Sequence, residues 1–484
     1  MSSRGSNASL QALDGRLPVL AHERIYGSYG SMLWTTAVLS AASWAYLIGS
    51  TFPSFGNTRL VILGYLIGLL IGEVLAVFAV GIPSFRYGVD TVDAAKASLG
   101  SRGAVVLLVM VLATSLGWAY VLMAMTARGV GRLVSAAASR DAPVDEHLVI
   151  ASALGLLLLV WCLARRGPAA MERLSKICAA GQILIALIIL GCVVSLQRMS
   201  PPLAHGGYPA HPITTDPLTQ IAYGVEFGFD NALTMLPFLG GLTRLVRHRR
   251  HIVGPTLIGS AILGAWLVAA VAALAAGVVT GSDPTIWIVE LMGPAVGSVV
   301  VGFLLVANLG TLVVLVYVAS VAVQQARPVA ALRWDWIIGL TLLPGAIFAF
   351  RTEWLLARVM TWLAYNGVMF VGLSAVLMTD FFFLKSQRIR VSHLFASPGK
   401  GIYWYAGGVN WIAMGAIVVC AGIYLALFDP ISLHVHPLFR YVGAGIPAVL
   451  LGSMTYYLAM RLLPAGPREP DPGHSKREAI QVGL

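Results

Sequence analysis

One apolar stretch of this chain carries side chains that a plain membrane anchor would lack. Residues 216–250 begin with Asp216, and their apolar part contains two further carboxylates, Glu226 and Asp230, and the amide of Asn231. The same stretch also holds residues that interrupt helices: Gly224, Gly228 and Pro237. Charge at membrane depth is costly, and a broken helix needs a polar lining to satisfy its backbone. We therefore predict a binding site at membrane depth, beside a break in the helix near Gly228.

The two carboxylates could serve either a ligand or the fold. Glu226 and Asp230 are four residues apart and hence lie on one face if the helix persists. They could bind ligand N–H groups, balance a cationic ligand or carry a proton; alternatively, they cap helix ends or bond backbone amides. Asn231 offers both a donor and an acceptor. Glu73 is the only other carboxylate at clear membrane depth, and it is a candidate for proton coupling or a structural partner.

The composition places the whole chain in a lipid bilayer. Of its 484 residues, 58% are hydrophobic and 11% are charged, and the mean hydropathy is +0.82. Soluble domains carry about 25% charged residues. The four cysteines form no CxxC pair and the histidines lack metal-ligand spacing, so no metal is expected beyond a possible sodium ion. The N-terminus lacks a continuous apolar region and a cleavage site, so no signal peptide is expected.

Twelve apolar segments approach the length of about 20 residues that a helix needs to cross a bilayer. They fall near 31–51, 60–83, 103–127, 148–164, 177–197, 217–242, 252–280, 295–323, 336–350, 356–379, 403–427 and 441–463. With the N-terminus inside, about three-quarters of the 32 lysines and arginines lie on the inner side. This bias predicts cytoplasmic termini, and it explains the net charge of +11 without a nucleic-acid partner.

The spans divide into two groups of five followed by a pair. Spans one to five and six to ten occupy segments of nearly equal length, which suits two inverted repeats. We expect an all-α integral membrane protein with about 12 transmembrane helices. The predicted segments are a cytoplasmic N-terminal segment at 1–30, the first repeat at 31–197, an external loop at 198–215, the second repeat at 216–380, spans eleven and twelve at 381–463, and a disordered cytoplasmic tail at 464–484.

Four local patterns resemble one family of transporters. GIPSFRYGVDTVDAAKASLGSRG follows the second span, MLPFLGGLTRLVR ends the sixth, LMTDFFFLK ends the tenth, and YWYAGGVNWIAM opens the eleventh. Together they resemble the nucleobase:cation symporter family, the purine/cytosine, allantoin and hydantoin permeases. The chain departs from that pattern at Ser98-Leu99-Gly100, which lacks an aromatic, and at Gly240-Gly241, where many members have an acid.

The resemblance implies a leucine-transporter-type fold with a five-plus-five inverted repeat and two C-terminal helices. In that fold a bundle of spans one, two, six and seven rocks against a scaffold of spans three, four, eight and nine. Substrate would sit at the midplane, between the broken spans one and six and the unbroken spans three and eight. Sodium, where it is used, would bridge spans one and eight.

The resemblance also points to substrate-binding residues. Trp118 matches the third-span tryptophan that stacks on a planar ring, and Phe229 would give the second stacking face. Asn308, the one amide in span eight, and Trp44 in the first span are further candidates. Apolar residues stand at or near two of the family's amide positions: Leu122 and Val316. Some amide contacts to the ligand are therefore missing.

For the coupling ion, the resemblance points to oxygen ligands on spans one and eight, and oxygen is what hard cations prefer. The carbonyls of Val38 and Ala41 match the first-span positions, while the Ala307 carbonyl and the Thr311 hydroxyl match those of span eight. Gly310 replaces a serine and so removes one oxygen. A weakened sodium site is expected, with proton coupling through Glu73, Glu226 or Asp230 as the alternative.

These observations predict a secondary active symporter of the inner (plasma) membrane, driven by sodium or protons and functional as a monomer. Its substrate would be a planar nitrogen heterocycle, and the added carboxylates of span six favour a donor-rich or cationic ring. The alternative is an amino-acid or amine transporter of the same fold, although LSAASWAY offers no glycine-rich segment for a carboxylate. An enzyme is not expected, because no concentrated set of nucleophile, base or metal ligands appears. A GxxxxGK[ST] nucleotide loop is absent as well.

Overall fold

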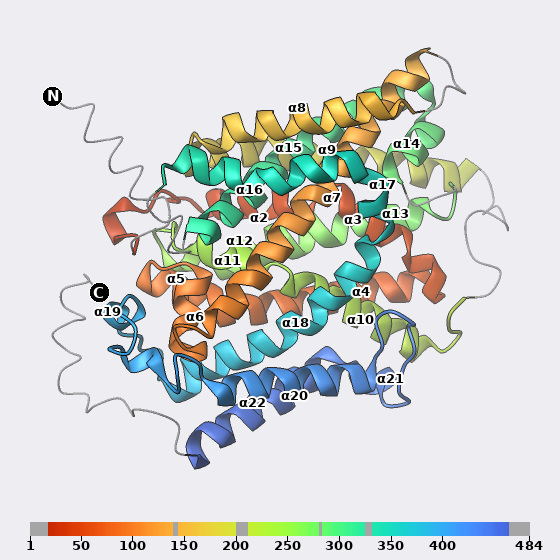
Figure 1. The fold of residues 1–484 in the computed structure, drawn as a ribbon. Helices are drawn as coiled ribbons and strands as arrows, with labels where there is room; N and C mark the ends of the chain where they lie inside the picture. The colour runs from red at the N-terminus through yellow and green to blue at the C-terminus, as the bar shows by residue number, and fades with distance from the viewer. Residues whose placement is uncertain (1–17, 139–143, 200–211, 280–282, 325–331, 464–484) are drawn as a thin grey trace, which may run out of the picture.

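The computed structural model describes residues 18–138, 144–199, 212–279, 283–324 and 332–463, and within them the chain forms helices and no β-strand. Helices run alongside one another as a bundle, with α8 (Glu146–Ala164) and α16 (Trp334–Phe348) along one edge. The opposite edge is formed by α20 (Trp411–Leu427) and α22 (Gly445–Leu462) (Figure 1). The predicted tail at 464–484 and parts of the predicted N-terminal segment and external loop lie outside the described residues.

Each of the twelve apolar segments predicted from the sequence contains helix. The first repeat comprises α2 (Tyr29–Ser40) with α3 (Ser43–Ser50), α4 (Thr58–Ala76) continuing through η3 (Val77–Gly81) and α5 (Ile82–Tyr87), α7 (Ala104–Ala138), α8, and α9 (Pro168–Met199). The second comprises α10 (Pro217–Leu233) with α11 (Leu236–Thr243), α12 (Val253–Thr256) with η5 (Leu257–Trp266) and α13 (Leu267–Ala275), α15 (Pro294–Gln324), α16, and α18 (Val359–Thr379) with η7 (Asp380–Leu384). Among the described residues, 8 helices are individually long and apolar enough to cross a membrane, and the bent first span makes 9.

Short helices lie at the two ends of the bundle. At one end are α6 (Thr91–Leu99) and α19 (Val391–Leu394), and at the other are α14 (Pro284–Met292) and α21 (Phe439–Val442) (Figure 1). The remaining short segments are η1 (Ala21–Glu23), η2 (Phe52–Phe55), η4 (Arg249–His251), η6 (Ala349–Arg351), α17 (Thr352–Ala357) and η8 (Ile402–Trp404). The α6 and α19 segments, both expected in inner loops, thus share one end.

The first span is interrupted at its middle. Helices α2 and α3 meet at an angle of 54° across Ala41 and Ala42. Ala42 adopts an extended conformation, with φ −67° and ψ 172°, and its side chain makes no capping hydrogen bond to α3. The interruption implied by the family resemblance is therefore present. It frees the last carbonyls of α2 and the first amides of α3 from regular helical pairing.

The sixth span is also interrupted, but later than the sequence suggested. Helix α10 runs through Gly228 and ends at Leu233, and α11 begins at Leu236. Pro237 occupies the first turn of α11, where its missing N–H costs no helical hydrogen bond. The prediction of a break near Gly228 is therefore wrong. Pro237 lies in the first turn of the second half-helix, whereas Gly224 and Gly228 pack against another helix.

The glycines bring the second and sixth spans into backbone contact. Gly64, Gly68 and Gly72 recur every four residues on α4 and lie against the backbone of α10, while Gly224 and Gly228 of α10 lie against the backbone of α4. This pair of helices has the most extensive contact in the described structure. Such small-residue stripes let membrane helices approach closely, because apolar side chains give no hydrophobic advantage inside lipid. Gly224 and Gly228 therefore join two helices rather than break one.

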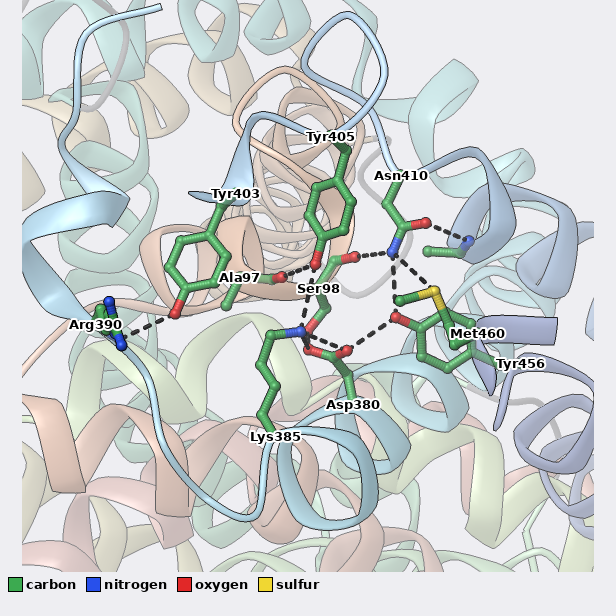
Figure 2. Close-up of polar contacts among 11 residues, drawn as sticks. Ala97, Ser98, Asp380, Lys385, Arg390, Tyr403, Tyr405, Asn410, Tyr456 and Met460 are labelled. Atoms are coloured by element: carbon green, nitrogen blue, oxygen red, sulfur yellow. Dashed lines mark hydrogen bonds and ion pairs between the residues drawn. The ribbon is translucent and has the colours of Figure 1, made fainter. Parts of the chain in front are cut away.

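A buried ion pair fastens the last two spans at the α6 end of the bundle (Figure 2). The Lys385 ammonium lies 2.5 and 2.7 Å from the two carboxylate oxygens of Asp380. Ser98 of α6 donates to Asp380 Oδ2 at 2.7 Å, and Tyr456 of α22 donates to Oδ1 at 3.0 Å. The carboxylate thus joins span ten to α6 and span twelve. Its buried charge is stabilised by one cation and two hydroxyl donors.

The segment that opens span eleven joins the same network. Asn410 caps α20, accepting from the Ala413 amide at 3.3 Å, and its Nδ2 donates to the Ser98 carbonyl at 2.8 Å. The Tyr405 hydroxyl donates to the Ala97 carbonyl at 2.7 Å. Asp380 and Asn410, both found through the family-like patterns, therefore serve a structural junction at this end of the bundle.

Candidate substrate and ion site

A small cavity lies where the two interrupted spans meet the unbroken third and eighth spans. Its walls come from α2, α3, α7, α11 and α15, with the end of α10 and the residues that connect α10 to α11. The lining residues are Leu39, Ser40, Trp44, Trp118, Asn231, Thr234, Met235, Phe238 and Leu315. No residue on this lining is charged. The position agrees with the expected midplane site between spans one, three, six and eight.

Tryptophans dominate one wall of the cavity. The rings of Trp44 and Trp118 lie 4.6 Å apart between centroids at an angle of 49°. Trp362 of α18 also contacts Trp118, in an edge-on arrangement with centroids 5.0 Å apart and planes at 83°. Trp118 is only 3% exposed. The Trp118 ring is therefore buried and in contact with two other tryptophan rings.

The cavity is small in this conformation. The enclosed space holds about one water molecule, far less than a heterocyclic ring needs. Trp44 belongs to the short half-helix after the break in span one, whereas Trp118 belongs to the unbroken helix α7. The two tryptophans therefore belong to different parts of the bundle, an interrupted span and an unbroken one.

The cavity lining also includes polar side chains. Asn231 Nδ2 donates to the Tyr65 hydroxyl at 2.8 Å, which fixes the amide against α4. The Ser40 and Ser260 hydroxyls share a hydrogen bond at 2.8 Å, and Ser40 lies at the end of α2. The lining thus offers one amide and a few hydroxyls, all uncharged.

The two carboxylates of span six turn away from the cavity, contrary to the sequence prediction. Both Glu226 oxygens accept backbone amides at the start of α22: Oε2 from Ala444 at 2.7 Å and Oε1 from Gly445 at 2.8 Å. Asp230 accepts the Tyr424 hydroxyl of α20 at 2.5 Å. A carboxylate at a helix N-terminus accepts hydrogen bonds from amides that have no helical partner, and its negative charge interacts favourably with the positive end of the helix dipole. Glu226 therefore caps α22 in span twelve, because the N-cap residue of that helix, Ala444, makes no side-chain hydrogen bond to it.

Phe229 is also absent from the cavity. Its side chain is 1% exposed and packs against Gly445 at the start of α22, on the same side of α10 as Glu226. Because the helix continues past Gly228, Phe229 keeps its helical direction toward the last two spans. Phe238, which follows the proline of α11, supplies the aromatic group from span six instead.

Asn308 fastens the interrupted first span rather than lining the cavity. Its Oδ1 accepts the Ser43 backbone amide at 3.3 Å and the Ser43 hydroxyl at 3.1 Å. Its Nδ2 donates to the Ser43 hydroxyl at 2.8 Å and to the Thr126 hydroxyl at 3.1 Å. Ser43 is the first residue of α3, so Asn308 satisfies an amide that the break leaves without a helical partner.

Replacing Asn308 by alanine is expected to lower the melting temperature of the purified protein and to abolish uptake. The change leaves the Ser43 amide and two hydroxyls buried without their partner, at about 1–3 kcal/mol for each unsatisfied group. Thr126→Val, which removes only one of these bonds, is the matched control and should cost about 1 kcal/mol. An Asn308→Ala protein that melts with the wild type would contradict the assigned contact.

Two of the expected ion ligands lie together. The Thr311 hydroxyl donates to the Val38 carbonyl at 2.6 Å, bringing oxygens of spans eight and one into direct contact. Gly310 faces span five, because an added Cβ would lie 2.6 Å from the Cys178 Cβ. Ala41 and Ala307, whose carbonyls were also expected as ligands, are both buried. A serine at position 310 would not fit here without movement, so glycine at this position serves close packing.

A sodium ion could be held by the carbonyl and hydroxyl oxygens of these residues, because they are uncharged hard donors of the kind sodium accepts. Thr311 contributes the only side-chain oxygen of the set.

Glu73 is fully buried at 0% exposure, on α4. Neither carboxyl oxygen makes a hydrogen bond within the described part of the chain. The Ser260 hydroxyl faces it without reaching hydrogen-bond geometry. Glu73 is therefore a carboxyl group inside the bundle that the fold does not use for capping or pairing.

Several cavity residues escaped the sequence argument. The lining residues Ser40 and Phe238 were not singled out, and neither was Trp362, which contacts the lining residue Trp118. The aromatic after Pro237 was a usable signal, since a half-helix that restarts at a proline places its first turn beside the break. Trp362 gave no local signal, because its contact with Trp118 spans two distant helices.

Comparison with solved structures shows the same fold. The inward-facing conformation of Mhp1 superposes with a TM-score of 0.73 at 16% identity, covering 96% of this chain and 96% of that one. Mhp1 in a closed conformation with bromovinylhydantoin bound, described as a nucleobase-cation-symport-1 family transporter, gives 0.72 at 16% identity, covering 94% and 97%. A Na+-coupled sialic acid symporter gives 0.62 at 11% identity, covering 96% and 94%.

No curated protein matches the sequence itself. The family model described as permease for cytosine/purines, uracil, thiamine, allantoin matches residues 23–444, nearly the whole chain. The fold and the match agree on a multi-pass membrane transporter and not an enzyme. The chain belongs to this family of cytosine/purine, uracil, thiamine and allantoin permeases.

Proposed function

We propose that this permease imports an uncharged planar nitrogen heterocycle across the inner membrane by cation-coupled alternating access. The observation that carries the proposal is the cavity between the two interrupted spans, with Trp44 and Trp118 on its wall. Aromatic faces suit flat heterocycles, and each stacking contact contributes about 1–3 kcal/mol in the related case of nucleobases.

The polar groups of the cavity support a ring with both N–H and C=O groups. Asn231 gives its Nδ2 to Tyr65, so its Oδ1 is the acceptor for a ring N–H. The Ser40 hydroxyl can donate to a ring carbonyl. Burial of these groups gives specificity, because a ring without matching partners would leave them unpaired.

An uncharged substrate follows from where the carboxylates lie. The sequence favoured a cationic or donor-rich ring because Glu226 and Asp230 were expected at the site. Glu226 instead holds the α22 amides and Asp230 the Tyr424 hydroxyl. With no acid on the lining, a cation would lose its hydration without gaining a counter-charge, which is costly.

Alternating access would use the two interruptions as hinges. Separation of Trp44 from Trp118 would open the cavity, and a bound ring would restore a continuous aromatic stack and favour closure. The last helical turn of α2 and the first of α11 border the cavity, so closure and binding involve the same residues. Coupling to sodium or protons then makes import concentrative.

The proposed arrangement in the membrane keeps both termini in the cytoplasm. The inner loops that contain α6 and α19 lie at one end of the bundle, as the positive-inside bias requires (Figure 1). One chain contains every element of the cavity, which supports a monomer as the working unit.

The proposal is tested by thermal shift of the purified protein against uracil, hypoxanthine, hydantoin and allantoin, with and without sodium. A ligand at 100 times its Kd stabilises the folded state by about 2.7 kcal/mol. We expect at least one uncharged ring to raise the melting temperature and cationic thiamine to leave it unchanged. Stabilisation by thiamine alone would overturn the uncharged-substrate proposal, and a response only to amino acids or amines would favour the alternative transporter.

Comparing the same thermal-shift measurements with and without sodium tests the ion site. A donor set with a single side-chain oxygen predicts that saturating sodium changes substrate affinity by less than about tenfold, or about 1.4 kcal/mol. Potassium at equal ionic strength is the control. Substrate binding that requires sodium outright would show that the Val38 and Thr311 oxygens form a strong site.

A further inference from the structure

The Glu73 carboxyl group occupies a place that a fixed negative charge could not hold. It is 0% exposed, and neither oxygen makes a hydrogen bond within the described residues. Transfer of an unpaired carboxylate from water into such surroundings is far costlier than transfer of the neutral acid. In the closed conformation, therefore, the group is stable as an acid that carries its proton.

Within the described residues, the elements packed most closely against α4 bring no cation to Glu73. The elements packed along α4 are α10, η2, η3, η5, α13 and α18. Of these, only α10 carries acidic or basic residues, namely Glu226 and Asp230. Both are directed at α20 and α22 through their hydrogen bonds, and both are acids. Ionised Glu73 would thus have to be stabilised by water, which requires the bundle to open.

Two hydroxyls connect this acid to the cavity. Ser260 faces the Glu73 carboxyl group, and its hydroxyl also bonds the Ser40 hydroxyl at 2.8 Å. Ser40 lines the cavity. Ser260 lies in η5, a π-helical segment of span seven, and such segments are frequent at functional sites in membrane and soluble proteins. The path therefore runs through spans two, seven and one to the substrate space.

We infer that Glu73 is the proton-binding group through which this permease couples transport to the proton gradient. In the opened state water reaches the carboxylate by way of Ser40 and Ser260, and a proton from the outer solution passes through this water to the carboxylate. The neutral acid then allows spans one, two and seven to close around the substrate. Proton and substrate both favour closure, so each strengthens the binding of the other. This inference rests on the proposed transport function.

The proton itself can be observed without any substrate. Infrared spectra of the full chain in lipid at neutral pH should contain a C=O band from the protonated Glu73 carboxyl group, which is isolated from the bands of other buried acids by subtracting the Glu73→Gln spectrum from that of the wild type. Glu290→Gln, which removes an exposed carboxylate of α14, is the matched control and should keep the band. If the Glu73→Gln spectrum retains the band, the protonated state of Glu73 is overturned, whatever the substrate proves to be.

The coupling role is then measured in proteoliposomes. Glu73→Gln should lose accumulation driven by a pH gradient at least tenfold while still exchanging substrate across the membrane. Glu73→Asp, which restores a titratable group, should recover part of the accumulation. Accumulation that persists in Glu73→Gln would overturn the coupling role.

If the infrared band is lost as expected but no ring binds the wild type, the substrate proposal fails and the proton site stands. Melting temperatures of both variants show whether they fold; should Glu73→Gln not fold, loss of the wild-type band at alkaline pH tests the same group.

Discussion

Replacing Gly68 by alanine is expected to prevent the recovery of folded protein. A Cβ at this position would lie 2.0 Å from the Val225 carbonyl oxygen and 2.7 Å from the Phe229 amide nitrogen. Both are backbone atoms of α10, so no side chain can rotate to make room. Relief requires the two helices to separate, which also disturbs the neighbouring glycine contacts. The cost exceeds the about 1–3 kcal/mol of ordinary overpacking.

The measurement is the yield of monodisperse protein in detergent and its melting temperature. Gly155→Ala is the matched control, because Gly155 also lies within a membrane helix but has no atom within 4 Å of an added Cβ. That variant should keep or slightly raise the stability, since alanine favours a helix over glycine by up to about 1 kcal/mol. Equal melting temperatures for Gly68→Ala and the wild type would refute the close helix contact.

Truncation of Trp118 to alanine is expected to weaken substrate binding by about 5- to 150-fold, the equivalent of the about 1–3 kcal/mol of one aromatic stack. The ring contacts both Trp44 and Trp362, so its loss also removes a packing contact from each of them. Trp118→Phe keeps an aromatic face and should lose less than about tenfold.

Substrate affinity is measured with purified variants by the ligand-induced shift in melting temperature. Trp336→Ala is the control, because Trp336 is 69% exposed on the outer surface of α16 and should leave the affinity unchanged. Parallel loss of affinity in both variants would point to a general effect of tryptophan removal. An unchanged affinity in Trp118→Ala would place the substrate away from the cavity.

The sequence was most informative where a segment's role depends on its own residues. Apolar length identified the helices, and the interruption of span one followed from the family resemblance. The glycines of span six were misinterpreted because a glycine can break a helix or let another backbone approach. Their partners, the glycines of α4, lie about 160 residues earlier, and the four-residue spacing in LGYLIGLLIGE was the signal that could have paired them.

The carboxylates were misplaced for a similar reason. Glu226 and Asp230 do lie on one side of α10, as their spacing predicted. That side, however, faces the last two spans, and no local pattern tells a ligand-binding face from a helix-packing face. The acceptors and donors concerned are separated by 218 residues for Glu226 and Ala444, and by 194 for Asp230 and Tyr424. Sequence reasoning identified the polar residues but not the direction in which they point.

The attachment of the last two helices has a consequence for biosynthesis. Glu226, Asp230 and Asp380 are inserted with the first ten spans, yet each has a partner in residues that the ribosome adds afterwards. Until α20 and α22 are made, Glu226 has no backbone amides to bind, and Asp230 and Asp380 lack their tyrosines. The nearly finished chain therefore carries incompletely satisfied acids in the bilayer, and insertion of the final helix pair is the step that completes them. Membrane quality control could distinguish finished from unfinished molecules by these acids alone.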